Sequence, residues 1–113
     1  MHITLYAVTF DCADADKLAR FWSELLRRPL DDGATAEFAS IGMSGEQDAP
    51  HLVFVQVPEA KQVKNRVHVD LVAHDFGAAV ERAVGLGATR LADRYRWTTL
   101  TDPEGNEFDI VAA

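Results

Sequence analysis

The sequence is poor in several features that would assign a protein to a specialised class. It has one cysteine, Cys12, among 113 residues, so the chain cannot form an internal disulfide or build a thiolate cage for a metal ion. Basic residues are outnumbered, with 11 Lys and Arg against 18 Asp and Glu and a formal net charge of −7. This acidic balance argues against nucleic acid and anionic membranes as partners, because both require a basic face.

Long apolar runs are also missing. No stretch approaches the roughly 20 apolar residues of a membrane span. The first residues lack the basic region and small-residue cleavage site of a signal peptide, so we expect a cytoplasmic protein. The hydrophobic share of 48% and the charged share of 26% are those of an ordinary globular domain. A single domain covering residues 1–113 is therefore expected.

The first half of the chain has the pattern of a strand, a helix and further strands. Residues 3–10 form a β-branched and aromatic run that is typical of a buried strand. Asp14 is a good N-cap for a helix predicted over 15–28, which Pro29 should end because its ring cannot continue the helix. After a turn, the segments 36–43 and 51–57 follow, separated by a polar loop at 44–50.

The second half repeats this plan. Residues 66–73 alternate as a strand, and Asp75 precedes a second predicted helix that ends at 85–87. A shift of 61 positions places Asp14 on Asp75 and Ala7 on His68. Each half is too small to be comfortable alone, so we expect the two to share one core. The later strands are predicted at 89–92, 97–101 and 107–112, the modules at 1–58 and 66–113, and a linker at 58–65.

Four segments of the chain carry a family resemblance. They are Asp14 to Trp22 around the first helix, Lys64 to Leu71, Leu86 to Thr89, and Asp102 to Phe108. In this order and spacing they resemble the vicinal-oxygen-chelate superfamily, and more narrowly its glyoxalase-like branch, which is also described with glyoxalase and bleomycin-resistance proteins. The resemblance implies an α+β fold in which two βαβββ modules form a curled mixed sheet around a cleft.

The resemblance fixes the place of a site better than its reaction. Members of the superfamily include lyases, epimerases, dioxygenases, thiol transferases and metal-free proteins that sequester drugs. Small members usually pair, and some exchange modules between chains. The resemblance therefore implies a homodimer, with the linker at 58–65 as the natural hinge for an exchange.

The family's metal ligands lie on the first and last strands of each module. The resemblance places them at Ala7, near Gln56, at His68 and at Asp109. Ala7 has no donor atom, and the superfamily usually has glutamate where Asp109 stands. The candidate metal set is therefore His68, Asp109 and Gln56, for zinc, nickel, manganese or iron, and it is less complete than catalytic metal sites usually are.

Period-two alternation predicts which side chains share the wall of the cleft. An acidic surface with aromatic walls suits a cation, a hydroxyl-rich ligand or a planar amine. His68 beside a carboxylate could also act as an acid or base near neutral pH. The predicted lining comprises His68, Asp70, Glu107, Asp109, Gln56, Thr99, Trp97 and Phe54.

These residues are equally consistent with a structural role. His68 fits a strand histidine bonded to a neighbour, Asp109 and Glu107 fit solvated carboxylates on an open sheet face, and Trp97 fits a dimer contact. Two functions follow. The first is a protein that binds a small aromatic or cationic molecule, in the manner of a sequestering or resistance protein. The alternative is a lyase, isomerase or dioxygenase that uses His68 and Asp109, with or without a metal.

Overall fold

The computed structural model describes residues 1–43 and 50–113. The predicted loop at 44–50 lies outside the described residues except for Pro50. The chain divides into two compact units, Met1–Ala60 and Lys61–Ala113, and this division falls within the predicted linker. In the described residues, no helix has both the length and the apolar character needed to cross a membrane.

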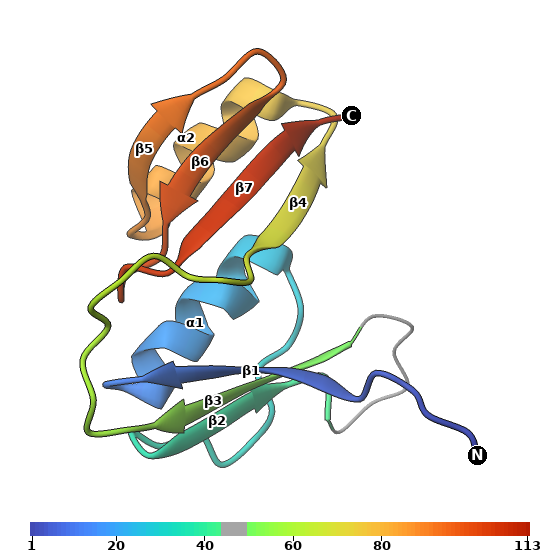
Figure 1. Ribbon diagram of the computed structural model, residues 1–113, viewed down its shortest axis with the longest axis vertical. Coiled ribbons are helices and arrows are strands. Elements are labelled where there is room, and N and C mark those ends of the chain that lie inside the picture. Colours follow the sequence, from blue (N-terminus) through green and yellow to red (C-terminus); the bar gives the residue numbers. More distant parts are fainter. Residues whose placement is uncertain (44–49) are drawn as a thin grey trace. The chain divides into compact units, whose positions relative to one another are not determined.

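The first unit is a three-stranded mixed sheet with one helix. Strand β1 (Ala7–Cys12) pairs in parallel with β3 (His51–Gln56), and β2 (Phe38–Ile41) pairs antiparallel with the other edge of β3. Helix α1 (Ala15–Leu26) connects β1 to β2 and packs on this sheet (Figure 1).

Helix α1 begins as the sequence predicts and ends slightly earlier. The Asp14 carboxylate accepts a hydrogen bond from the Lys17 N–H at 3.1 Å and caps the first turn. The helix ends at Leu26, because Arg27 adopts a left-handed conformation with φ 53°. The helix therefore ends before Pro29 is reached. This is expected, because proline disfavours a helical conformation in the residue that precedes it.

Strand β1 starts at Ala7, so the prediction that it covers residues 3–10 is wrong at both ends. Its parallel register on β3 begins with Ala7 opposite His51, where β3 itself begins. Ile3 and Leu5 precede this pairing and are 79% and 72% exposed. Their apolar character alone does not create a strand, because a strand requires a partner for its backbone groups.

An aromatic cluster forms the core of the first unit. The Phe10 ring stacks on Phe54 with centroids 5.0 Å apart and packs on Trp22 of α1 at 5.3 Å. Phe54 has no exposed surface. The prediction that Phe54 lines a ligand-binding wall is therefore wrong, because its side chain lies in the core beneath the helix rather than on an exposed face.

The second unit contains a four-stranded mixed sheet. Its elements are β4 (Val69–Ala73), α2 (Phe76–Leu86), β5 (Thr89–Asp93), β6 (Trp97–Thr101) and β7 (Glu107–Ala112). The strand order is β4-β7-β6-β5, and β4 runs parallel to β7 while the other pairs are antiparallel (Figure 1). The α+β class predicted from the sequence is confirmed.

The two units repeat one plan. In each, the first strand pairs in parallel with the last, and an aspartate caps the helix; the Asp75 carboxylate accepts from the Ala78 N–H at 3.3 Å. The second unit has a regular additional strand, β5. At that place the described part of the first unit has only an isolated bridge, Leu30 to Ile41.

Helix α2 covers one face of the second sheet. It contacts β4 and β7, and its Val80 and Ala83 are buried. The alternate residues Phe108 and Ile110 of β7 are buried as well, so they face α2 and form the core of this unit. Glu107, Asp109 and Val111 consequently lie on the opposite side of β7, which we call the open face.

The turn between β6 and β7 is organised by one buried carboxylate. Asp102 is 2% exposed, and its Oδ1 accepts hydrogen bonds from the backbone N–H groups of Glu104 at 2.9 Å and Asn106 at 3.0 Å. The Asn106 side-chain amide donates to both carboxylate oxygens. Gly105 has φ 88°, which glycine adopts without strain. This network fixes the register between β6 and β7.

Replacing Asp102 by alanine should therefore destabilise the protein. We expect Asp102→Ala to lower the free energy of unfolding by about 2–4 kcal/mol, because several part-buried donors lose their acceptor. Urea denaturation followed by circular dichroism measures this loss. Glu59→Ala, which removes an exposed carboxylate, should change stability by less than about 0.5 kcal/mol. Equal stability of the two variants would contradict the role assigned to Asp102.

Candidate functional site

The register of the second sheet aligns polar side chains from three strands. Asp70 of β4 lies opposite Asp109 of β7, and Asp109 lies opposite Thr99 of β6. We call Asp70, Asp109 and Thr99 the donor rung. Asp70 and Thr99 lie 39 and 10 positions before Asp109 in the sequence. The register of the sheet makes both of them direct neighbours of Asp109 on the open face.

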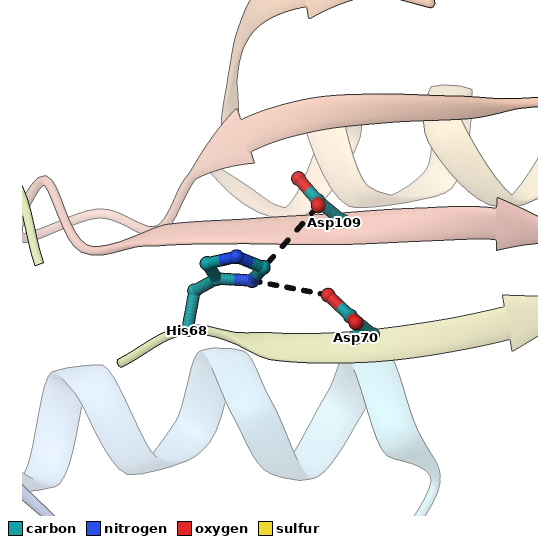
Figure 2. Close-up of side chains that lie close together, drawn as sticks. All are labelled: His68, Asp70 and Asp109. Atoms are coloured by element: carbon teal, nitrogen blue, oxygen red, sulfur yellow. Dashed lines mark ion pairs between the residues drawn. The ribbon is translucent and has the colours of Figure 1, made fainter. Parts of the chain in front are cut away.

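His68 completes a group of three ligand-type side chains. It immediately precedes β4, which begins at Val69 rather than at residue 66 as the alternation predicts. Its Nδ1 lies 3.0 Å from Asp70 Oδ1 and 3.9 Å from Asp109 Oδ2 (Figure 2). One ligand atom from each of the three residues lies within 4.8 Å of the others. We call His68, Asp70 and Asp109 the triad.

The two carboxylates of the triad have different surroundings. The Asp109 side chain is 17% exposed, and its Oδ1 accepts a hydrogen bond of 2.6 Å from the Thr99 hydroxyl. The Asp70 side chain is 59% exposed and has His68 as its neighbour. Asp109 is therefore held in one orientation by its strand partner, whereas Asp70 is restrained far less.

Glu107 lies two residues before Asp109 but is engaged elsewhere. Its Oε1 accepts from the Asn65 N–H at 3.1 Å and lies 3.2 Å from Lys61 Nζ. Burial raises the pKa of Glu107, but the backbone N–H groups of Asn65 and Glu107 and the Lys61 ammonium outweigh burial, so the pKa lies below its ordinary value. Glu107 thus anchors the segment that leads to His68.

An apolar rung lies beside the donor rung. Val72 and Trp97 are both opposite Val111, and these three residues form what we call the apolar rung. Val72 is 72% exposed and Trp97 is 39% exposed. Because two residues along a strand span about 6.6 Å, the open face presents an accessible apolar surface next to the triad.

Only some of the predicted site residues lie together in the structure. It brings together His68, Asp70, Asp109 and Thr99, with Trp97 one rung away. Gln56 belongs to the first unit, and its amide Nε2 donates to the Ala13 carbonyl at 3.0 Å. Its role as a metal ligand stays a prediction.

Sequence reasoning assigned Asp70 to ligand binding and missed it as a potential metal ligand. The signal was present, since His68 and Asp70 are separated by two positions and such residues share a face of an extended segment. Asp70 was not considered as a metal ligand because only the usual ligand positions of the family were considered.

Comparison with known proteins agrees with this fold. The sequence profile described as the glyoxalase-like domain matches residues 7–111 of this chain. The chain belongs to the glyoxalase-like domain family. This confirms the resemblance found in the sequence. No curated protein sequence matches the chain significantly.

Solved structures of other glyoxalase-like proteins share the fold at low identity. A glyoxalase/bleomycin resistance protein/dioxygenase family enzyme from Burkholderia phytofirmans is 16% identical, with a TM-score of 0.79 over 97% of this chain and 98% of that one. The fosfomycin resistance protein FosX from Listeria monocytogenes is 15% identical, with a TM-score of 0.77 over 100% and 93%. A mutant of that protein, solved in complex with Mn(II), is 14% identical, with a TM-score of 0.76 over 98% and 90%.

The triad is a candidate site for a small divalent cation. Nitrogen and oxygen ligands bind first-row metals at about 2.0–2.2 Å, so two ligands at right angles are about 3 Å apart. The 3.0 Å distance from His68 Nδ1 to Asp70 Oδ1 matches this value, whereas the 3.9 Å distance to Asp109 Oδ2 and the 4.8 Å limit for the whole group exceed it, so the side chains would have to close in around an ion. One imidazole and two carboxylates also form a donor set that suits manganese, iron or zinc.

Neutralising Glu107 should lower the free energy of unfolding by an amount that depends on pH. A carboxylate whose pKa is lower in the folded state than in the unfolded state stabilises the folded protein fully when the pH is above the unfolded-state pKa. This stabilisation disappears as the pH falls through the folded-state pKa. We expect Glu107→Gln to cost about 1 kcal/mol at pH 7. The cost should shrink as the pH falls below 4.5, the ordinary value for glutamate.

Urea denaturation of chelator-treated protein across this pH range measures the effect. Glu81→Gln, on the exposed surface of α2, provides the matched control and should leave stability unchanged at every pH. A cost of Glu107→Gln that persists undiminished at low pH would contradict the role of the charge.

Proposed function

We propose that this protein binds a small molecule through a divalent cation held by His68, Asp70 and Asp109. The single observation that carries this proposal is the convergence of the three ligand atoms within 4.8 Å on the open face of the second sheet. The Thr99 hydroxyl supports it by orienting Asp109, as the partners of metal ligands commonly do.

The three residues would leave part of the ion's coordination sphere to the ligand. Three protein donors are the usual number in sites that keep positions open for water or substrate. A bound divalent cation polarises an oxygen of such a molecule. His68 and the carboxylates would hold the charge, and the exposed side of the triad would admit the ligand.

The apolar rung indicates what else the small molecule carries. Trp97 and Val72 offer a flat apolar surface about 6.6 Å from the donor rung. A molecule with adjacent oxygen atoms for the cation and an aromatic or apolar body for Trp97 would use both rungs. This agrees with the preference for an aromatic ligand predicted from the sequence.

A second candidate is acid–base chemistry without a metal. The specific observation in its favour is the 3.0 Å approach of His68 Nδ1 to Asp70 Oδ1. A carboxylate at that distance holds the Nδ1–H tautomer, which leaves Nε2 as the basic nitrogen. The metal titration below separates the two candidates, because only the first requires an ion.

Metal binding tests the first proposal directly. Chelator-treated protein titrated with Mn²⁺ in a calorimeter should bind the ion, and His68→Ala should weaken binding by about 100-fold or more, since even partners of ligands contribute 10–100-fold. His74→Ala removes an exposed histidine of the same unit outside the triad and should bind like the unchanged protein. Binding that survives His68→Ala would refute the assigned site.

The contribution of Trp97 can be measured with catechol, a flat ring with two adjacent oxygens. In equilibrium dialysis with Mn²⁺-loaded protein, Trp97→Ala should weaken catechol binding by about 5–10-fold, because the ring loses its aromatic contact. Trp97→Phe should recover part of the affinity. Tyr95→Ala removes an exposed aromatic ring that is outside the apolar rung, and an equal loss there would contradict the assignment.

A further inference from the structure

The hydrogen bond between Thr99 and Asp109 restricts how Asp109 can bind an ion. The Thr99 hydroxyl donates to Oδ1 at 2.6 Å, while Oδ2 is the oxygen that lies toward His68 at 3.9 Å. A carboxylate can bind a cation through one oxygen or through both. The hydroxyl occupies one lone pair of Oδ1 and holds the carboxylate in one orientation, so Oδ2, the oxygen nearer His68, is the better placed of the two to bind an ion in the triad.

The surroundings of Thr99 make this hydrogen bond specific. Its neighbour on the other side is Ala92 of β5, which has no polar side-chain atom. Threonine is branched at Cβ and has few rotamers in a strand, so the hydroxyl stays directed at Asp109. In the described ranges 1–43 and 50–113, no other side chain donates a hydrogen bond to Asp109 Oδ1.

Cation size determines what this restriction selects. Ca²⁺ takes 6–8 oxygen ligands at 2.3–2.6 Å and commonly uses both oxygens of a carboxylate. First-row transition metals bind at shorter distances, accept imidazole readily and need fewer protein ligands. A triad in which one carboxylate is oriented to bind through a single oxygen therefore suits the smaller ions better than Ca²⁺.

We propose that Thr99 is a positioning residue that favours binding through Asp109 Oδ2 alone over binding through both carboxylate oxygens, and thereby favours ions such as Mn²⁺ over Ca²⁺. The inference rests on the proposed function of the triad and adds the basis of its ion selectivity. It assigns to Thr99 a role through Asp109, in place of the direct ligand contact predicted from the sequence.

The test compares Mn²⁺ and Ca²⁺ binding by calorimetry in chelator-treated protein. Thr99→Val keeps the shape and the strand preference but removes the donor. We expect it to weaken Mn²⁺ binding by about 10-fold, the lower end of the effect of such partners, with little loss of Ca²⁺ binding. The Mn²⁺/Ca²⁺ affinity ratio should therefore fall by about 10-fold.

Two variants make the comparison specific. Thr99→Ser retains the hydroxyl and should preserve the affinity ratio. Thr101→Val removes the next threonine on the same face of β6, opposite Glu107 rather than Asp109, and should also preserve it. Infrared difference spectra of the metal-bound carboxylates supply a second readout, because one-oxygen and two-oxygen binding differ in the separation of the two C–O stretching bands. Thermal unfolding checks that Thr99→Val is folded.

The outcomes distinguish this inference from the proposed function. If the unchanged protein binds Mn²⁺ through His68 and Thr99→Val leaves both the affinity ratio and the infrared bands unchanged, the role of Thr99 is refuted while the metal site stands. If the unchanged protein binds neither ion, the metal site is refuted, and the selectivity of Thr99 is refuted with it. A fall in the ratio for Thr99→Val that Thr99→Ser does not show supports the inference.

Discussion

The parallel pairing of β4 with β7 is the constraint on which the candidate site depends. It places Asp70 opposite Asp109 and thereby brings together carboxylates from the start and the end of the second unit. A shift of one residue in this register would turn one of the two carboxylates toward the buried face beneath α2. The alternation of Phe108 and Ile110 with Asp109 prevents this shift, because both apolar side chains are buried in the core.

The same alternation gives strand β7 one face that packs in the core and one face that carries residues of the candidate site. The buried side of β7 supplies the core, and the open side supplies Asp109 to the triad and Val111 to the apolar rung. The Asp102 network holds the turn that sets β7 against β6, which is also what places Thr99 opposite Asp109. The orientation of the carboxylate thus depends on a turn that contains no residue of the triad.

Local patterns predicted the larger part of the fold. Asp14 and Asp75 marked the two helix starts because capping depends on a side chain and the next few backbone groups. The strands β6 and β7 were predicted with their observed bounds. The start of β1 was not, because the apolar run at residues 3–6 looks like a strand whether or not a partner strand lies beside it.

The site was harder to predict than the elements that carry it. Phe54 was assigned to an open wall, but which side of β3 is buried is decided by the position of α1 and by the Phe10 and Trp22 rings. Asp70 was visible in the sequence as a neighbour of His68, yet its closeness to Asp109 depends on pairing between distant segments. The Thr99 hydrogen bond is a matter of register between β6 and β7, which no local pattern specifies.

The unequal exposure of the triad has a consequence for kinetics. His68 and Asp70 are 39% and 59% exposed, so water can reach two of the three ligands from outside without any movement of the backbone. An ion held there would exchange readily with the surrounding solution, and its occupancy would follow the free concentration of the metal. Such an ion would bind reversibly rather than remain a permanent part of the protein.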